Sequence, residues 1–575
     1  MSLSLEVAPS AAPEAPDVDG WFAALGDDYL GRVPADSLRP GMVNGWRLRW
    51  RGRELDVQVD ADFPFSVARV YLAGYSRAQA QPHIEKDGKL CLGSKAVPGD
   101  RVHTVQVALA EAFQLLTENE TRQHDDDFRE DFGLYWLSWA DRSDLRVEVM
   151  PGPGGARKSI LGRAALTEGR VFVFPGKDEA GRICTNLTGA APKGLKETPV
   201  ISIDPLPAPD RYPESAGELW ALVDARSLGG TDLLVRLMSN DPMEAFVVLA
   251  GKAPSGREHY AAVRLRRPLD RGGQPTKRRA IRDGVKGTDD PTRSLFARFK
   301  IERLTTQRMD SSSSRLPEGV QHQIAAAKTI VVGCGALGSG VARMLAQAGV
   351  EHLGLVDPEQ LGWENIRRHE LGGGVVGHGK AKALANSIRA DLPMIGFVEG
   401  YATTFATFAR ENPEALQQAD LVVSCTGDWT ADASVEHALA QPGRKAVAVY
   451  GWMEAHALAS HAVLIGKTGA RLADGFEENG KFRLPVVAGG KPPPPECGGT
   501  STTFGAVELS HAQALVAKLA IDSLRKLETA AAWRSWLADA AAFDEVEATM
   551  ASGWVTARGK PDDMGGLFSG EWMFP

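Results

Sequence analysis

The first part of the chain alternates apolar and polar residues in the manner of antiparallel β-strands. A period of two runs through WRLRWRGRELDVQVDADFPF and VARVYLAGY, as in strands that bury one face. The later stretch VQVALAEAFQLLTEN has its apolar residues at helical spacing. The order of helix, strands, loop and helices predicts a small α+β domain over residues 19–145, after a disordered lead-in over residues 1–18.

Residues 146–305 predict a β-rich connecting domain. Short strand candidates such as VFVFPG, PVISID, AFVVLAG and YAAVRLRRPL recur among Gly, Pro and Arg residues. The basic stretch DRGGQPTKRRAIRDGVKG mixes both signs of charge and is interpreted as a solvated loop. No constellation of metal ligands or nucleophiles occurs in this part of the sequence, which therefore predicts a connector.

A segment of linker composition, QRMDSSSSRLPEGV, precedes a C-terminal part with a different pattern. The run AKTIVVGCGALGSGVARMLAQAGVEHLGLVD predicts a strand, a Gly-rich turn, a helix and a second strand. ADLVVSCTGD and KAVAVYGW add buried strands, and GAVELSHAQALVAKLAIDSLRKL adds a long helix. We predict a Rossmann-like domain over residues 306–535 and a C-terminal extension over residues 536–575, in a multidomain protein combining α/β and α+β folds.

Composition narrows the class of protein. Lys and Arg number 65 against 73 Asp and Glu, and a net charge of -8 over 575 residues argues against nucleic-acid binding. No apolar run reaches the roughly 18 residues of a membrane span. The N-terminus also lacks the basic region of a signal peptide, so we expect a cytoplasmic protein without a membrane segment. The five cysteines contain no CxxC pair, which excludes a disulfide scaffold and a structural zinc site built on such pairs.

A glycine-rich turn is the first candidate for chemistry. Gly333, Gly335, Ala336 and Gly338 belong to a GxGxxG sequence that follows a predicted strand and opens a predicted helix. Such glycines let backbone N–H groups approach a phosphate at the positive helix terminus. Asp357 ends the next strand, where a carboxylate can accept from ribose hydroxyls. These features alone also suit an NAD(P)-dependent dehydrogenase.

Four further polar residues follow the turn, namely Asn365, Arg368, Lys380 and Asp428. Together with the glycines and Asp357, they resemble the adenylating domain of the ubiquitin-activating (E1-like), ThiF and MoeB superfamily. The resemblance implies ATP as substrate, with Asn365 and Arg368 near the phosphates, Lys380 neutralising the triphosphate and Asp428 holding Mg²⁺. Hydride transfer needs none of these charges, whereas attack on an α-phosphate needs cationic and metal clamps.

Two residues near the ends of this domain are further candidates. Cys497 lies in GGKPPPPECGGTSTTFGA, ahead of a helix, and the resemblance implies that it is the catalytic cysteine. A nearby helix N-terminus would favour its thiolate, although a structural loop cysteine remains the alternative. Arg315 is the candidate for the arginine that this superfamily donates across a dimer, or an ordinary exposed arginine. Cys334 and Cys425 are interpreted as packing residues.

The N-terminal domain carries a second candidate thiol, Cys91. Its surroundings resemble the ubiquitin-conjugating (E2-like) fold. The matching positions are Pro82, Gly88, Leu90, Cys91 and Leu92. His83 stands where that family has the Asn that stabilises the oxyanion, and an imidazole N–H is a candidate replacement.

The order of E2-like domain, connector and E1-like domain resembles the fused E1–E2 proteins of bacterial CBASS anti-phage operons. That resemblance implies a homodimer, formed through the adenylation domain, that acts on the C-terminus of a cGAS/DncV-like nucleotidyltransferase. It implies ATP and Mg²⁺, a thioester relay from Cys497 to Cys91, and conjugation to a target amine. The alternatives are a ThiF/MoeB-like adenylyltransferase that activates a sulfur carrier, and a nucleotide-binding scaffold with inert cysteines.

Overall fold

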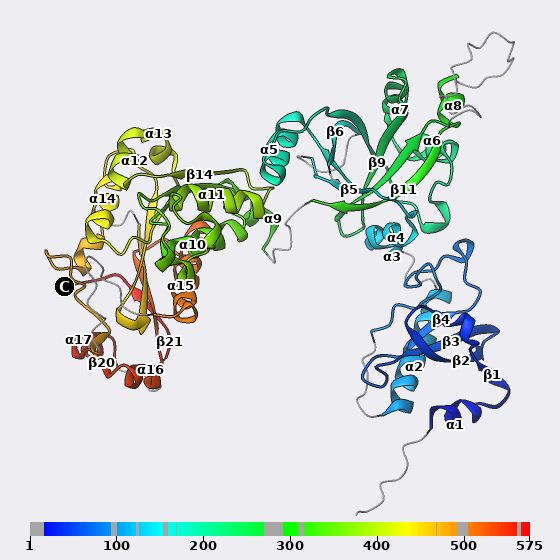
Figure 1. Ribbon diagram of the computed structural model, residues 1–575, viewed down its shortest axis with the longest axis horizontal. Helices are drawn as coiled ribbons and strands as arrows, with labels where there is room; N and C mark the ends of the chain where they lie inside the picture. The colour runs from blue at the N-terminus through cyan, green and yellow to red at the C-terminus, as the bar shows by residue number, and fades with distance from the viewer. Residues whose placement is uncertain are drawn as a thin grey trace, which may run out of the picture. The chain divides into compact units, whose positions relative to one another are not determined.

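The computed structural model describes residues 17–93, 100–121, 126–152, 159–167, 169–268, 291–309, 316–466, 469–490, 504–559 and 565–574 (Figure 1). The chain divides into two compact units, one of residues 1–181 and 192–309, the other of residues 182–191 and 310–575. No helix within the described ranges is long and apolar enough to cross a membrane.

The first unit begins with a four-stranded antiparallel sheet in the order β1-β2-β3-β4. The alternation read in the sequence buries Trp46 and Leu48 of β2 against Leu55 and Val57 of β3, in a core shared with Val105 of the long helix α2. The elements of this part are α1 (Val18–Ala23), η1 (Gly26–Asp28), β1 (Tyr29–Arg32), η2 (Ala35–Ser37), β2 (Met42–Trp50), β3 (Arg53–Asp60), β4 (Arg69–Leu72), η3 (Arg77–Gln79), α2 (Arg101–Glu120), α3 (Asp127–Glu130) and α4 (Phe132–Trp139).

The connecting domain is a closed barrel with the strand order β10-β11-β5-β7-β6-β8-β9, so the prediction of a β-rich domain is confirmed. Parallel pairing of β11 with β5 and of β8 with β9 joins strands that are distant in the sequence. The elements are β5 (Arg146–Val149), β6 (Ile160–Thr167), β7 (Arg170–Phe174), α5 (Lys177–Thr188), β8 (Lys196–Ser202), η4 (Pro209–Arg211), α6 (Ala216–Arg226), α7 (Gly230–Ser239), β9 (Glu244–Lys252), β10 (Glu258–Arg266), α8 (Pro291–Phe296) and β11 (Lys300–Arg308).

Helix α4 belongs to the core of the barrel. Its buried aromatic side chains Phe132, Tyr135, Trp136 and Trp139 share one hydrophobic cluster with residues of β9, β10, α6 and α7. The indole Nε1 of Trp136 donates a hydrogen bond of 2.9 Å to the backbone oxygen of Leu304 in β11. The segment that follows α2 is therefore fixed by the connecting domain.

The second unit is built on an eight-stranded sheet in the order β14-β13-β12-β15-β16-β17-β19-β21. The first five strands run parallel and the last three pair antiparallel. The elements are α9 (Glu318–Ala326), β12 (Lys328–Val332), α10 (Ala336–Gln347), β13 (His352–Val356), η5 (Trp363–Arg368), η6 (Gly373–Val375), α11 (Lys380–Asp391), β14 (Phe397–Tyr401), α12 (Phe405–Glu411), α13 (Pro413–Gln418), β15 (Leu421–Ser424), α14 (Trp429–Leu439), β16 (Val447–Met453), η7 (Ala455–Ala457), β17 (Ala459–Ile465), η8 (Leu472–Gly475), β18 (Val487–Gly489), α15 (Ala506–Leu524), β19 (Ala532–Leu537), α16 (Ala540–Glu545), β20 (Ala548–Met550), α17 (Ser552–Arg558) and β21 (Gly566–Glu571).

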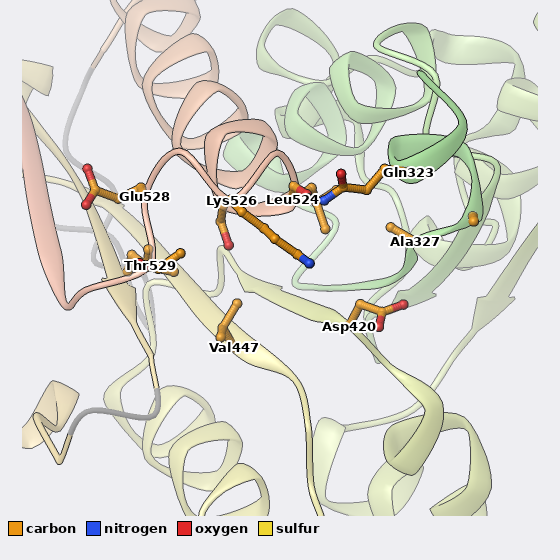
Figure 2. Close-up of a pocket in the computed structure, with 11 residues that line it drawn as sticks. Gln323, Ala327, Asp420, Val447, Leu524, Lys526, Glu528 and Thr529 are labelled. Carbon is orange, nitrogen blue, oxygen red and sulfur yellow. Dashed lines mark hydrogen bonds between the residues drawn. The ribbon is translucent and has the colours of Figure 1, made fainter. Parts of the chain in front are cut away.

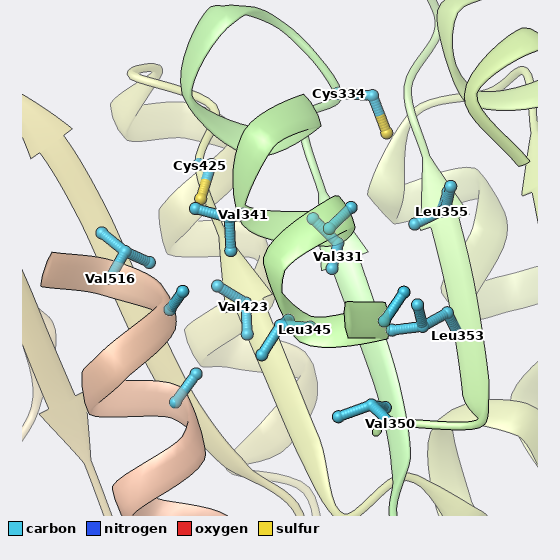
Figure 3. Packing of buried hydrophobic residues seen from close by; sticks show 14 of the residues in the cluster. Val331, Cys334, Val341, Leu345, Val350, Leu353, Leu355, Val423, Cys425 and Val516 are labelled. Carbon is cyan, nitrogen blue, oxygen red and sulfur yellow. The ribbon is translucent and has the colours of Figure 1, made fainter. Parts of the chain in front are cut away.

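Both faces of this sheet are buried, which confirms the prediction of a Rossmann-like fold. Helices α10, α11 and α15 cover one face, where Val331 and Val423 of the central strands meet Val341 and Val516 of α10 and α15 (Figure 3). The other face packs against α12 to α14. Strand β12 lies between β13 and β15, so the chain order reverses there, and ligands of such sheets bind outside the carboxyl ends of the strands at this point.

Candidate functional site

The glycine turn after β12 is packed so closely that two of its positions exclude a side chain. Gly333 has φ +81°, and a Cβ there would lie 2.9 Å from the backbone of Cys425. A Cβ on Gly338 would lie 1.8 Å from the backbone oxygen of Gly333. Gly335, in contrast, faces open space, and α10 begins at Ala336 without a side-chain cap. The backbone N–H groups at this helix end therefore suit an anion.

Asp357, at the end of β13, is buried and holds the glycine turn. Its Oδ2 accepts from the backbone N–H of Cys334 at 2.7 Å, and its Oδ1 accepts from the N–H of Glu359 at 2.7 Å. Burial raises the pKa of Asp357, and the two backbone donors act in the opposite direction. His369 contacts the same turn, because its Nε2 lies 2.7 Å from the backbone oxygen of Cys334. Sequence reasoning missed this residue.

The basic residues of the predicted site lie on the elements that follow. Lys380 starts α11 and is 5% exposed, and its Nζ lies 2.5 Å from a carboxylate oxygen of exposed Glu359. Asn365 accepts the N–H of Gly362 at 2.9 Å, which fixes η5. The guanidinium of Arg368, at the end of η5, stacks on the ring of Phe504 at 4.7 Å from its centroid.

Asp428 follows β15 and caps α14. Its Oδ1 accepts from the N–H of Thr430 at 2.7 Å. One helical turn later, Asp432 is buried and accepts from the hydroxyls of Ser424 and Thr426. Burial raises the pKa of Asp432 to about 6. Sequence reasoning missed Asp432, although its spacing from Asp428 and the hydroxyl residues before it were available as a signal.

Asp428 suits Mg²⁺ only in part. Within the described residues, no group of three or more His, Cys, Asp or Glu side chains is arranged to hold a metal ion. Mg²⁺ is commonly held by one or two carboxylates together with substrate phosphates and water. An exposed Asp428 beside the glycine turn is compatible with that mode and not with a site built from protein ligands alone.

Cys497 and Arg315 lie outside the described residues. The residues on either side of the segment 491–503, which contains Cys497, are described. Before it, the N–H groups of Val486 and Val487 donate to the two oxygens of Glu454 at 2.8 Å each, and Glu454 is also 2.7 Å from Nε2 of buried His461. After it comes Phe504, the ring beneath Arg368. The described residues on either side, Val487 and Phe504, are therefore held by contacts beyond the carboxyl ends of the parallel strands.

The two described cysteines of the Rossmann-like domain are structural. Cys334 and Cys425 are buried in the core between the sheet and α10 (Figure 3). Burial raises the pKa of both thiols. The interpretation of Cys334 and Cys425 as packing residues is confirmed.

A cavity of about 540 Å³ lies at the opposite edge of the same sheet (Figure 2). Asp420 and Val447 line it at the amino ends of β15 and β16, and Lys526 lines it beyond the end of α15. None of the predicted site residues within the described ranges lines it. The glycine turn and the cavity therefore occupy opposite edges of the sheet.

In the N-terminal domain, Cys91 is exposed at the end of a short turn. Its N–H donates to the oxygen of His83 at 2.8 Å, and its Sγ lies 3.8 Å from Oε1 of Glu85. Partial burial raises the pKa of the Cys91 thiol, as does the charge of Glu85, while Lys89 lowers it. At neutral pH, a smaller fraction of such a thiol is present as thiolate than of a thiol whose pKa is depressed.

His83 links this turn to the helices after α2. It has φ +59°, and its N–H donates to the hydroxyl of Tyr135 at 2.6 Å. Its ring Nε2 lies 2.8 Å from Oδ2 of Asp127, and the side chain of Asn119 donates to the oxygen of Pro82 at 2.9 Å. Tyr135 and Asp127 were missed by sequence reasoning, because an aromatic at helical spacing predicts a core residue.

Comparison with known proteins matches both ends of the chain. The ThiF family matches residues 309–463, and Prokaryotic E2 family B matches residues 42–143. The ATP-dependent ubiquitin transferase-like protein Cap2 of Enterobacter hormaechei subsp. hoffmannii (strain UCI 50) is 28% identical over 231 residues, which are 39% of this chain and 35% of that protein. The adenylyltransferase and sulfurtransferase MOCS3 of Bos taurus is 40% identical over 103 residues, 17% of this chain and 21% of that protein. The matched segment thus spans about a third of the first relative and a fifth of the second.

Among solved structures, Escherichia coli MccB with ATP is similar at 18% identity and a TM-score of 0.30, over 40% of this chain and 65% of that one. The two family matches cover separate parts of the chain, in the predicted order. With a prokaryotic E2 family B domain ahead of a ThiF-family domain, this chain is a fused E1-like and E2-like protein, as its sequence predicts.

Proposed function

We propose that the chain is an ATP-dependent ubiquitin-transferase-like ligase that activates the C-terminus of a partner protein and joins it to a target amine. The observation that carries the proposal is the stacking of Arg368 on Phe504. Arg368 is expected at the phosphates, and Phe504 is the first described residue after the segment that contains Cys497. Phe504 therefore lies beside a residue expected at the nucleotide, which supports capture of the acyl group from an adenylate.

In the first step, a carboxylate oxygen of the partner attacks the α-phosphorus of ATP, and the bond to the departing pyrophosphate breaks. The N–H groups at the start of α10 and the side chain of Lys380 bind the phosphates, while Asp357 accepts from the ribose hydroxyls. Asp428 would hold Mg²⁺, which supplies positive charge against the phosphate oxygens. Lys380 exchanges the carboxylate of Glu359 for a phosphate oxygen at little cost, because Glu359 is exposed.

The acyl group then moves along two thiols. The Cys497 thiolate attacks the acyl carbon of the adenylate, and the bond to AMP breaks. The Cys91 thiolate attacks the resulting thioester and releases Cys497, and an amine finally attacks the Cys91 thioester. Each thioester divides one difficult acylation into easier steps.

We propose a cGAS/DncV-like nucleotidyltransferase as the partner, in CBASS anti-phage defence in the cytoplasm. The proposal rests on the resemblance to fused E1–E2 proteins and on similarity to a relative named as ubiquitin transferase-like. A homodimer through the adenylation domain, with Arg315 reaching the other subunit's nucleotide, completes it.

The test is ATP–pyrophosphate exchange by the full chain in the presence of a cGAS/DncV-like nucleotidyltransferase, followed by thiol-sensitive gels. The variant Cys497→Ala is expected to retain exchange and to form no thioester. The variant Cys91→Ala is expected to retain the Cys497 thioester and to form no amide conjugate. Cys184→Ala, which alters a buried thiol of the connecting domain, is the matched control.

Different failures point to different alternatives. Loss of exchange in Cys497→Ala would contradict the order of steps, and an unchanged conjugate in Cys91→Ala would contradict the relay. Adenylation of a carrier without any thioester would favour a sulfur-carrier adenylyltransferase. Absence of exchange with nucleotide still bound would favour a scaffold.

A further inference from the structure

The Cys91 turn lacks the asparagine side chain that serves as oxyanion donor in the E2-like family it resembles. His83 occupies that position, and its ring Nε2 is engaged by Asp127 at 2.8 Å. Attack on a thioester places negative charge on the carbonyl oxygen, and a preorganised donor stabilises that charge. The donor for this site must then be sought among the groups around the turn.

The hydroxyl of Tyr135 is such a group. It accepts the N–H of His83 at 2.6 Å, and the oxygen of His83 in turn accepts the N–H of Cys91 at 2.8 Å. The hydroxyl of Tyr135 is thus hydrogen-bonded to His83, whose backbone oxygen accepts a hydrogen bond from Cys91. Since its oxygen acts as acceptor in that bond, its hydrogen remains to be donated, and no acceptor for it occurs among the described residues.

The electrostatics also connect Tyr135 with Cys91. Burial raises the pKa of Tyr135, the hydrogen bond from the backbone of His83 lowers it, and the negative charges of Cys91, Asp131 and Asp127 raise it. The phenol therefore stays protonated at neutral pH and responds to negative charge at Cys91. Tyr75 differs, since burial raises its pKa without any contribution from Cys91.

Tyr135 is also held rigidly. It is 9% exposed, in the aromatic cluster that α4 shares with the barrel. The neighbouring residue Trp136 is fully packed and bonded to Leu304 of β11. A donor fixed in this way needs no reorganisation when charge develops, which is the requirement for an oxyanion hole.

We propose that Tyr135 is a catalytic residue of the E2-like site and donates a hydrogen bond from its hydroxyl to the oxyanion formed at the Cys91 thioester. This inference rests on the proposed function of Cys91 as an acyl carrier. When an amine attacks, its lone pair forms the C–N bond and the carbonyl π pair moves to oxygen, where Tyr135 stabilises it. The pair then returns, the C–S bond breaks, Cys91 leaves as thiolate and the surplus proton of the amine passes to water.

The test loads Cys91 chemically, so that it does not depend on adenylation. A glycine-ended peptide α-thioester is exchanged onto Cys91 in the full chain with Cys497→Ser, and discharge to free lysine is followed by intact-protein mass spectrometry. Tyr135→Phe is expected to slow discharge by about 10²-fold, the usual cost of one oxyanion donor. Alkylation of Cys91 by iodoacetamide, which forms no oxyanion, is expected to stay within about twofold.

Tyr75→Phe is the matched control. It removes a hydroxyl that accepts the N–H of Gln81 at 3.0 Å in the same part of the domain, and it should discharge at the wild-type rate. The proposal is overturned if Tyr135→Phe discharges within about threefold of wild type, if Tyr75→Phe is equally slow, or if alkylation falls by the same factor. A Cys91 thiol that does not accept the peptide overturns it as well, because loading passes through the same oxyanion. Failure of ATP-dependent charging alone would instead count against the proposed function.

Discussion

A methyl group at position 335 tests the proposed nucleotide site without disturbing the fold. Gly335 has φ −77° and ψ −154°, which alanine adopts freely, and a Cβ there meets no atom within 4 Å. Gly335→Ala should therefore unfold at the wild-type temperature. In the proposed complex, however, the same space holds a phosphate, and the methyl displaces at least one N–H···O bond to an anion. Such bonds contribute about 1.5–3 kcal/mol, so the KM for ATP in pyrophosphate exchange should rise by roughly 10- to 100-fold.

Gly338→Ala is the contrasting variant. Its Cβ would lie 1.8 Å from the backbone oxygen of Gly333, so the turn must open, and overpacking of this kind costs about 1–3 kcal/mol or more. Gly338→Ala should thus lose stability and exchange together, whereas Gly335→Ala loses exchange alone. If Gly335→Ala kept the wild-type KM while remaining folded, the phosphates would not lie against this turn and the assignment would be refuted.

Three further outcomes follow from the site. Lys380→Met should lower the rate of pyrophosphate exchange at least about 10²-fold. Its thermal unfolding temperature should change little, because the exposed carboxylate of Glu359 is solvated without its partner. Glu359→Gln is the control and should keep the wild-type rate of exchange. Burial raises the pKa of Asp432 to about 6, above its unfolded value of about 3.9, so ionising it costs stability as pH rises from about 4 to 6. Asp432→Asn should remove up to about 3 kcal/mol of that pH dependence in thermal unfolding measured across this range, and an unchanged profile would show that Asp432 ionises freely. Glu454→Gln weakens the hydrogen bonds that fix the backbone before the segment with Cys497. The Cys497 thioester should then form more slowly, while the rate of pyrophosphate exchange stays unchanged. Equal loss of both rates would contradict a positioning role for Glu454.

The sequence predicts the glycine-rich turn after β12 well because the constraints on its conformation are local. Gly333 and Gly338 must be glycine for contacts within a few residues or with the adjacent strand end, and Asp357 follows directly from the next strand. The core pattern of the parallel strands is similarly local, since each strand is buried on both faces.

Other features depend on distant parts of the chain and could not be predicted in this way. Tyr135 reaches the Cys91 turn from a helix that lies beyond α2, and its spacing alone is that of any core aromatic. Closure of the barrel depends on parallel pairing of β5 with β11, which stands more than a hundred residues later in the sequence. Asp432 gains its raised pKa only from burial in the folded domain.

The burial of α4 in the barrel also limits how the gene can be divided. An aromatic side chain typically buries about 150–250 Å², and α4 contributes four of them to the barrel's core. A recombination breakpoint between α4 and β5 would leave these rings in water on one fragment and an open cavity in the other. The E2-like part of this protein is therefore not a transferable cassette, and it must be expressed, inherited and exchanged together with the barrel that completes it.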